Sequence, residues 1–245
     1  NNVPRGTFER IYMLKDYLNE ININATEKQL AELERFKDLL LEKNKVMNLT
    51  GITESDEVDR LHFTDSAYPL TLPELKNAKK IIDVGTGAGF PGIVLKILAP
   101  EKEILLNDSL LKRLKFLDEV IVDLDLKDIE TVHARSEDLA HVAAHREAYD
   151  VAISRAVARL ATLTEYMMGF VKIGGFMLSM KSGDIDEEAA EAKKAIEVLG
   201  GEIVNIHKYR LFDEFDRSIV VIKKIKTTPK KYPRNKNLPK TKPIL

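Results

Sequence analysis

The sequence lacks several features that would assign it to particular protein classes. It contains no cysteine among its 245 residues, which excludes a disulfide framework and a thiolate metal site. Its apolar runs fall short of the ~18 to 20 residues that a membrane helix needs, and its first residues lack the basic-then-apolar pattern of a secretion signal. We therefore expect a cytoplasmic protein without a membrane partner.

An excess of charge of one sign is also missing, because the formal net charge at pH 7 is −1. A nearly neutral chain by itself disfavours a nucleic-acid partner, since binding to phosphates draws on a positive field. The charge is nevertheless uneven: residues 223–245 contain nine Lys and Arg side chains and no acidic one. This basic segment is a candidate for binding RNA, and the alternative is a lysine-rich end that is merely solvated.

Hydrophobic spacing divides the chain into three parts. The first is rich in predicted helices, and Thr26 with Gln29 makes a capping box at the start of an amphipathic one. A shorter helix is expected to begin at Ser55, whose hydroxyl would cap it. Prolines at positions 69 and 73 then mark a boundary. We expect a helical cap over residues 1–68, a single α/β domain over 69–226 and a basic tail over 227–245.

Short apolar runs alternate with helical stretches from residue 79 onward, which is typical of βαβ units and a mostly parallel sheet. The last two runs have no helix between them, so they predict an antiparallel hairpin at one edge. A sheet that ends in this way resembles the class I methyltransferase fold, which is Rossmann-like and seven-stranded. The expected strands are 80–84, 103–107, 129–133, 149–154, 175–181, 202–211 and 218–224, and the expected helices are 93–99, 111–124, 136–145, 160–171 and 185–199.

A glycine-rich turn joins the first expected strand to a helix that begins with proline. Gly85, Gly87 and Gly89 let the backbone turn tightly and approach a ligand that a Cβ atom would exclude. The dinucleotide fingerprint would need a glycine where Phe90 stands, so the pattern fits a pyrophosphate less well than the amino-acid and ribose parts of S-adenosylmethionine. Tight packing alone is the alternative explanation for such a turn.

Polar residues follow the other parallel strands at the same edge of the sheet, where open α/β sheets bind ligands. Asp108 is placed to accept hydrogen bonds from ribose hydroxyls, or else to cap the helix that follows. Ser136 and Glu137 lie in a polar turn where an adenine edge is expected, and a helix N-cap is the alternative. Arg155 brings five donors to this edge, and these need partners.

Several segments together resemble the glucose-inhibited division protein B family, also called RsmG, the guanine-N(7) methyltransferases of bacterial small-subunit ribosomal RNA. The resemblance covers nearly the whole chain. It rests on residues 44–50 (NKVMNLT), 62–66 (HFTDS), 83–92 (DVGTGAGFPG), 108–113 (DSLLKR), 154–158 (SRAVA) and 228–234 (TPKKYPR). The first, second and last of these have no generic explanation as parts of a nucleotide-binding fold.

The resemblance implies an enzyme that uses S-adenosylmethionine to methylate N(7) of a guanine in 16S ribosomal RNA, either free or within a small-subunit assembly particle. The lone pair on N(7) is free at neutral pH, so no general base is required and no catalytic acid or base is assigned. We expect the guanidinium of Arg155, beside the site, to bind a carboxylate of the cofactor or an RNA phosphate. By position, the family implies cofactor contacts at Gly85, Phe90, Ser136, Glu137 and Arg155.

Candidate RNA contacts lie in the cap and in the tail. In the cap, Asn48, His62 and Asp65 are placed to border the base, and hydrogen bonding on a helix surface is the alternative. The tail departs from the family pattern, because the usual Gly-Thr-Pro-Asn stretch does not follow its Tyr-Pro-Arg, and this leaves its detailed contacts open. The tail residues expected to clamp phosphates or stack on a base are Lys230, Lys231, Tyr232 and Arg234.

Two other functions stay open at the level of sequence. A nicotinamide-dependent oxidoreductase would use the same glycine turn, although the third glycine of its fingerprint is missing. A non-catalytic RNA-binding or ribosome-assembly protein would keep the same fold. His141 and His145 are four apart on an expected helix, but without an evident third ligand we expect no metal site. We expect a monomer.

Overall fold

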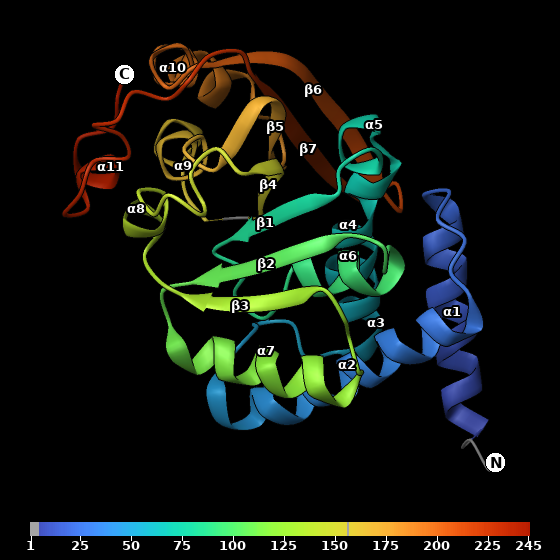
Figure 1. The fold of residues 1–245 in the computed structure, drawn as a ribbon. Coiled ribbons are helices and arrows are strands. Elements are labelled where there is room, and N and C mark those ends of the chain that lie inside the picture. The colour runs from blue at the N-terminus through green and yellow to red at the C-terminus, as the bar shows by residue number, and fades with distance from the viewer. Residues whose placement is uncertain (1–4, 156) are drawn as a thin grey trace.

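The computed structural model describes residues 5–155 and 157–245, so residues 1–4 of the expected cap and Ala156 of the expected strand-end motif lie outside the described residues (Figure 1). Its centre is a seven-stranded sheet with the order β3-β2-β1-β4-β5-β7-β6. The first five strands are parallel, and β7 runs antiparallel between β5 and β6, which confirms the expected fold. The strands are β1 (Lys80–Val84), β2 (Glu103–Asp108), β3 (Ile129–His133), β4 (Tyr149–Arg155), β5 (Val171–Ser182), β6 (Gly201–Leu211) and β7 (Phe215–Lys224).

Most of the expected helices are present, with small shifts at their ends. The helix after the glycine turn begins at Gly92, so Pro91 precedes it instead of occupying its first position. The helices before the first strand are α1 (Arg5–Glu20), α2 (Glu27–Met47), α3 (Ser55–Glu57), the π-helix η1 (Val58–Thr64), α4 (Asp65–Ala67), the 3-10 helix η2 (Tyr68–Thr71) and α5 (Pro73–Lys76). The later helices are α6 (Gly92–Leu98), α7 (Leu111–Asp123), α8 (Ser136–Leu139), α9 (Leu160–Met167), α10 (Asp186–Val198) and α11 (Leu238–Thr241).

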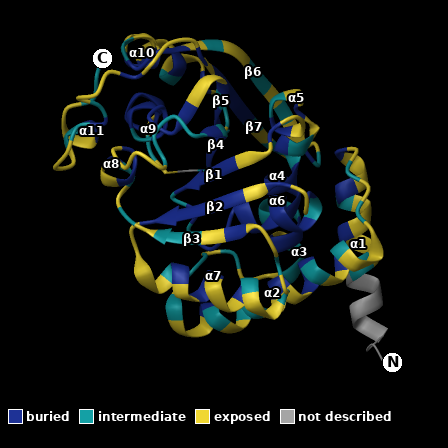
Figure 2. Ribbon diagram, in the orientation of Figure 1, coloured by how far each residue is buried: buried dark blue, intermediate teal, exposed yellow. Residues whose placement is uncertain are grey.

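Helices cover both faces of the sheet, and the central strands between them are buried (Figures 1 and 2). Neighbouring residues of a strand point to opposite faces, so Ile81 packs into the core under the cap while Ile82 packs into the core under α9 and α10. In a parallel sheet covered on both sides, each strand is a continuous apolar run in the sequence, and this is why the strands could be predicted clearly. The cap shares a core with the sheet and so lies fixed against one of its faces.

In the cap, the start of α2 agrees with the prediction but the start of α3 does not. Thr26 caps α2 through the predicted box, in which its hydroxyl accepts from the Gln29 amide and its own amide donates to the Gln29 side chain. The prediction that Ser55 caps the next helix is wrong, because Glu54 holds the cap position. The hydroxyl of Ser55 is buried and finds no partner among the described residues.

A buried ion cluster fixes η1 to α2. Lys37 Nζ donates to Glu34 at 2.7 Å and to both carboxylate oxygens of Asp59 at 2.7 and 2.8 Å. Burial raises the pKa of Asp59 to about 7, against the opposing effect of the Lys37 charge. π-Helical turns are rare in proteins, and those that do occur are often found at functional sites. This one carries His62 to the edge of the sheet.

The prediction of a helix over residues 136–145 is wrong beyond the first turn, because α8 ends at Leu139. The residues that follow form turns in which His141 Nε2 bonds to the Pro233 carbonyl and His145 Nδ1 bonds to the Tyr149 hydroxyl. The two histidines therefore have separate partners and do not share a helix face. Bonds to the distant tail therefore hold these residues in turns, although the spacing of their side chains suits a helix.

The basic tail packs along the body of the protein. Arg146 donates to the carbonyls of Thr228 and Tyr232, at 2.8 and 2.9 Å. Farther along, Arg234 forms a two-pronged ion pair with Glu165, whose side chain is only 1% exposed. These contacts hold the start of the tail beside Arg146, just before the amino end of β4, and its later part against α9. Within the described part of the chain, no helix has the length and apolarity to cross a membrane.

Candidate functional site

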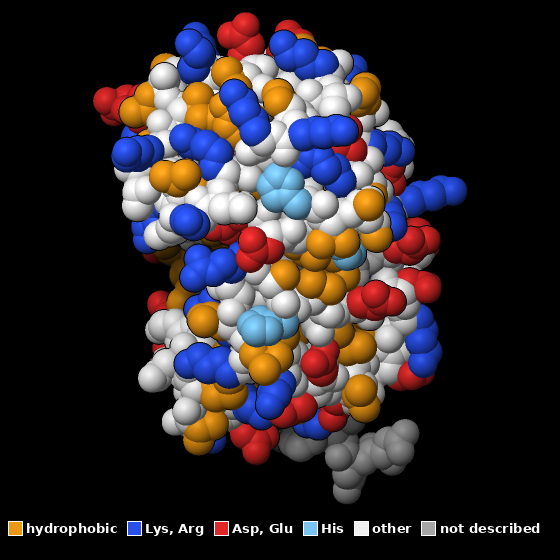
Figure 3. Space-filling model, turned by 60° about the vertical axis from the view of Figure 1, so that its left-hand side comes forward, with side chains coloured by type: hydrophobic (Ala, Val, Ile, Leu, Met, Phe, Trp, Pro, Cys, Tyr) orange, Lys and Arg blue, Asp and Glu red, His pale blue; other side chains and the backbone are white. Residues whose placement is uncertain are grey.

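A cavity of about 530 Å³ opens where β1, β2 and β4 end. Figure 3 brings forward the side on which the strand arrowheads end in Figure 1, and Lys and Arg side chains gather over its upper part, at the height of α10 and the tail. The cavity is lined by Leu49, Thr50, His62, Gly85, Thr86, Gly87, Ala88, Phe90, Asn107, Asp108, Ser109, Arg113, Arg135, Ser136, Glu137, Arg155, Val157, Tyr166 and Asn237. One wall therefore comes from the ends of the strands and another from the cap.

The glycine turn forms the floor of this cavity. Gly85 and Gly87 line it with φ angles of +71° and +62°, which favour glycine. Gly89 has a φ of +98° but lies behind the turn, where an added Cβ atom would meet Ile93 at 2.7 Å. Gly89 is thus required by packing, as is Gly85, where an added Cβ atom would meet Val157 at 2.8 Å, and only Gly87 leaves open space at the cavity.

A buried carboxylate holds the turn from below. Asp83 Oδ2 accepts hydrogen bonds from the Thr86 hydroxyl at 2.7 Å and from the Gly92 amide at 2.9 Å. Burial raises the pKa of Asp83 to about 6, and these two donors oppose the rise. The turn is therefore fixed at both of its ends by the strand that precedes it.

Asp108 ends β2 and faces both the turn and the cavity. Its carboxylate accepts from the amide of Gly87 at 3.0 Å and from that of Leu110 at 2.8 Å, and the Arg113 guanidinium lies 3.4 Å away. The helix α7 begins after Leu110 without a side-chain cap. Asp108 thus supports the glycine turn, and its place on the cavity wall agrees with the predicted site position.

The third strand contributes the predicted polar turn. Ser136 and Glu137 both line the cavity, and the Ser136 hydroxyl donates to Asn107 Oδ1 at 3.2 Å. The Asn107 amide in turn donates to the carbonyls of Val132 and Ala134. Arg135 holds the N-cap position of α8, so Ser136 is not the cap residue.

Arg155 connects the strand edge to the cap. Its Nη1 donates to the Leu61 carbonyl at 3.0 Å and lies 3.3 Å from Asp65 Oδ2, and its Nη2 lies 3.0 Å from His62 Nδ1. Asp65 Oδ1 is also 3.3 Å from Arg217 Nε. Burial lowers the pKa of Arg155, and the Asp65 charge opposes this shift. The main partners of this guanidinium are therefore residues of the protein.

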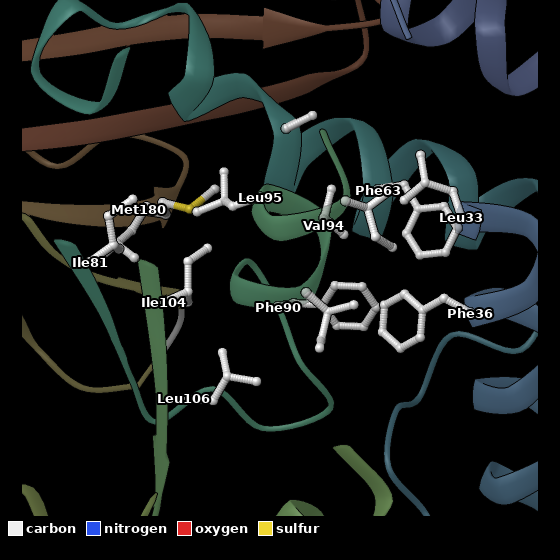
Figure 4. Packing of buried hydrophobic residues seen from close by; sticks show 14 of the residues in the cluster. Leu33, Phe36, Phe63, Ile81, Phe90, Val94, Leu95, Ile104, Leu106 and Met180 are labelled. Atoms are coloured by element: carbon white, nitrogen blue, oxygen red, sulfur yellow. The ribbon is translucent and has the colours of Figure 1, made fainter. Parts of the chain in front are cut away.

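His62 stacks on Phe90 and so closes the cap over the turn. The two ring centroids are 4.5 Å apart at an interplanar angle of 21°. Behind them, Phe36 from α2 and Phe63 from η1 pack near Phe90 in the shared core (Figure 4). Burial and the Arg155 charge lower the pKa of His62 to about 3, so the imidazole is neutral near pH 7.

Some predicted site residues lie outside the cavity. Asn48 is exposed and ends α2 in a left-handed conformation, with φ of +49°. Asp65 lies beneath Arg155 and does not line the wall. In the tail, the guanidinium of Arg234 is paired with Glu165, while Lys230 and Lys231 are exposed. The tail residue that does reach the wall is Asn237.

The cavity also contains residues that sequence reasoning missed. Thr50 is the last residue of the 44–50 segment, but nothing in the spacing of that segment identifies Thr50 as a site residue. Tyr166 comes from the middle of α9 and Asn237 from the tail, so only the folded structure brings them to the wall. Asn107 directly precedes Asp108 at the end of β2, so the signal of a strand end at a ligand site applied equally to it, whereas Arg113 lies in the first turn of α7.

Comparison with known proteins finds a consistent set of relatives. The profile of a family described as GidB, rRNA small subunit methyltransferase G, matches residues 29–219. A protein of that name, ribosomal RNA small subunit methyltransferase G, from Desulforamulus reducens is 48% identical over 232 residues, which cover 94% of this chain and 97% of the relative. Its namesake from Alkaliphilus oremlandii is 48% identical over 236 residues, with coverage of 94% and 99%.

Solved structures with a similar fold are more distant in sequence. The ribosomal protein L11 methylase of Lactobacillus delbrueckii subsp. bulgaricus aligns with a TM-score of 0.52 and 15% identity, covering 72% of this chain and 81% of that one. TrmN from Thermus thermophilus aligns with a TM-score of 0.50 and 16% identity, covering 68% and 53%. At this level of identity, the two structures support the fold alone.

Proposed function

The chain belongs to the rRNA small subunit methyltransferase G family, and from this premise we propose that it transfers a methyl group from S-adenosylmethionine to N(7) of a guanine in 16S ribosomal RNA. The observation that carries the proposal is the cavity between the glycine turn and the cap. Its two walls come from different parts of the chain, as a site for two substrates needs. Neither a nicotinamide oxidoreductase nor a non-catalytic assembly protein is favoured by these relatives.

The residues at the cavity fit S-adenosylmethionine. The volume of about 530 Å³ lies within the ~300 to 1,000 Å³ typical of small-molecule sites. Gly87 leaves room beside the turn that a side chain would fill, and at Gly85 an added Cβ atom would meet Val157 at 2.8 Å. Asp108 is placed to accept bonds from ribose hydroxyls, and Ser136 with Glu137 to hold the adenine. Gly89 would act from behind, by keeping the turn in place, whereas Phe90 lines the cavity and would hold the cap through its stack on His62.

S-adenosylmethionine supplies an activated methyl group on a sulfonium. The chain then has to orient the acceptor nitrogen, because N(7) needs no deprotonation before attack, and orientation can contribute up to ~7 to 11 kcal/mol. Positive charge develops on the purine during transfer, so a cation directed at the base would oppose the reaction. The neutral His62 meets this requirement. Arg155 acts through the cap, by holding η1 against the end of β4.

RNA would reach the cavity along the tail, whose Asn237 lines the cavity. Lys230 and Lys231 are exposed earlier in the tail and Tyr232 is half-buried beside them, with the Lys231 ammonium 5.2 Å from the ring centroid. Exposed cations next to an aromatic ring suit phosphates and a stacked base. We further propose that the enzyme acts as a cytoplasmic monomer, on free RNA or on an assembling small subunit, and that the boundaries near residues 68 and 226 delimit its parts.

A methylation assay tests the proposed function directly. Small-subunit ribosomal RNA from cells that lack this protein is incubated with purified enzyme and labelled S-adenosylmethionine, and the modified nucleotides are mapped. We expect one 7-methylguanine, and we expect calorimetry to detect binding of S-adenosylmethionine but not of NAD. Label at another atom, or in no nucleotide of free RNA or of the assembling subunit, would refute the proposal.

A further inference from the structure

The hydrogen bonds around His62 determine which ring nitrogen carries the proton. Arg155 Nη2 lies 3.0 Å from His62 Nδ1, and a guanidinium can only donate. Nδ1 must therefore accept, and the proton of the neutral imidazole resides on Nε2. His62 Nε2 is 2.7 Å from the Thr50 hydroxyl oxygen. The imidazole thus donates to Thr50.

Thr50 consequently has both of its acceptor positions filled. Besides the bond from His62, its hydroxyl oxygen accepts from the Ile52 amide at 3.0 Å. A hydroxyl offers two lone pairs and one proton, so the remaining proton must point away from both donors. Asn44 fixes the backbone of Thr50 as well, because its side chain bonds to the amide and to the carbonyl of that residue, each at 2.9 Å.

The oriented hydroxyl belongs to the cap wall of the cavity. Thr50 and His62 line the same cavity as polar residues at the ends of β2 and β3. A donor on the cap side is therefore available to a ligand that enters between the cap and the glycine turn. Guanine presents two acceptors on one edge, N(7) and O6, whereas adenine presents N(7) beside an amino donor. A fixed donor next to the methyl acceptor therefore distinguishes these two bases.

We propose that the Thr50 hydroxyl donates to O6 of the target guanine and selects guanine over adenine, with His62 as the positioning residue that fixes the direction of this hydroxyl. The inference rests on the proposed function, since it names a specificity contact for that reaction. No proton leaves Thr50 or His62 during methyl transfer. Their part is to place O6, and with it N(7), by a hydrogen bond of fixed polarity.

Base analogues at the mapped target nucleotide test this contact. 2-Aminopurine lacks O6 but keeps N(7), whereas inosine keeps both and lacks only the 2-amino group. The ratio of kcat/KM for guanine to that for 2-aminopurine is compared between the wild type and Thr50→Val. We expect this ratio to be about fivefold larger in the wild type, as for one neutral hydrogen bond, while the ratio for guanine to inosine is the same in both. Intrinsic differences between the bases cancel in the comparison.

Further variants separate this role from a structural one. Thr50→Ser keeps the hydroxyl and should restore the wild-type ratio. His62→Gln keeps an acceptor for Arg155 and a donor for Thr50, so it should preserve most of the selectivity, whereas His62→Leu should lose it. Thr53→Val, in the exposed part of the same loop, is the matched control. Each ratio is measured within one variant, so partial unfolding does not change it.

The outcomes also separate this inference from the proposed function. Equal ratios in the wild type and Thr50→Val, in an enzyme that methylates N(7) of guanine, would refute the contact and leave the function intact. Weaker binding of S-adenosylmethionine to Thr50→Val, with unchanged ratios, would show that the hydroxyl serves the cofactor and would equally overturn the inference. A wild type that methylates no guanine N(7) would refute the function itself.

Discussion

The two walls of the cavity are built in different ways. On the strand wall, Gly87 is held by Asp108 from the neighbouring strand, and parallel pairing sets their distance. On the cap wall, His62 depends on Arg155, which lies 93 residues away in the sequence. The strand wall is thus fixed by backbone geometry and the cap wall by a few polar side chains. We expect substitutions in the cap wall to disturb the alignment of two substrates, and those in the strand wall to affect mainly cofactor binding.

Arg155→Ala should have the largest effect, because it removes the link between the walls. Leu61 and His62 lose a donor, and the buried Asp65 loses one of its two arginine partners. We expect the free energy of unfolding to fall by about 3 kcal/mol and methyl transfer to be nearly lost. Urea denaturation and transfer of a labelled methyl group measure the two effects.

Two further variants show which part of the link matters. Arg155→Lys keeps the charge but cannot reach all three partners, so it should be intermediate in both measurements. Asp65→Asn removes the carboxylate and leaves the bonds to Leu61 and His62, so its activity should exceed that of Arg155→Ala. If Arg155→Ala keeps full activity and stability, the cap is held by its apolar core alone.

Two glycines of the strand wall should separate stability from binding. In Gly89→Ala the new Cβ atom would meet Ile93 at 2.7 Å and Leu117 at 2.9 Å, so we expect a loss of about 2 kcal/mol in the free energy of unfolding. In Gly87→Ala the Cβ atom meets only the Gly85 carbonyl oxygen, at 4.0 Å, and the left-handed backbone costs about 1 kcal/mol.

Calorimetry measures how strongly each of the two glycine variants binds S-adenosylmethionine. Gly87→Ala places a methyl group at the cavity and should weaken binding more than Gly89→Ala does, although it is the more stable variant. The reverse order would mean that the turn binds the cofactor through its shape alone and not through the open space beside Gly87.

The strand wall could be predicted from the sequence because its signals are local. Buried parallel strands are continuous apolar runs, so the limits of β1 and β3 agree with the prediction at both ends. The ends of such strands meet at one edge, which brought Gly85, Asp108 and Arg155 together in advance of any structure. These inferences need only the order of elements and the pleat of a sheet.

The cap wall could not be predicted to the same depth. The spacing of His62 and Asp65 indicated that they share a face, and both do contact Arg155, but no sequence pattern identifies that partner. The role of Thr50 depends on which atoms donate to it, which only the folded arrangement defines. The helix expected over 136–145 was wrong for a similar reason, since bonds from the distant tail replace its later turns.

A smaller effect is expected on the free energy of unfolding at acid pH, through His62 in the cap wall. The pKa of His62 is lowered to about 3 from an ordinary value of about 6.5, so the unfolded chain binds this proton more readily than the folded one. Its contribution to stability is complete above pH 6.5 and is lost as the pH falls from there toward 3. At pH 5 we expect the wild type to have lost up to about 2 kcal/mol through this residue.

Urea denaturation of the wild type and of His62→Gln, at pH 7.5 and at pH 5, isolates this contribution. The glutamine variant does not titrate, so its stability should change less over this range, and other groups cancel in the difference. A pH dependence that is the same in both proteins would mean that the imidazole is not held neutral by its burial and by the Arg155 charge.

The smallest effect on stability is expected in the tail. The double variant Lys230→Ala with Lys231→Ala removes two exposed cations and should change the free energy of unfolding by less than about 0.5 kcal/mol. If these lysines bind phosphates, the slope of log affinity for ribosomal RNA against log salt should become shallower by about 1.5. Filter binding at several salt concentrations measures that slope, and binding of S-adenosylmethionine should not change.

The matched control removes the same charge from outside the tail. Lys76 and Lys79 are exposed near the amino end of β1, away from the cavity. Their double alanine variant lowers the net charge equally, so a general effect of charge would shift the salt slope as much as the tail variant does. Only a larger shift in the tail variant shows that RNA contacts the tail, because counterion release depends on the phosphates contacted rather than on net charge.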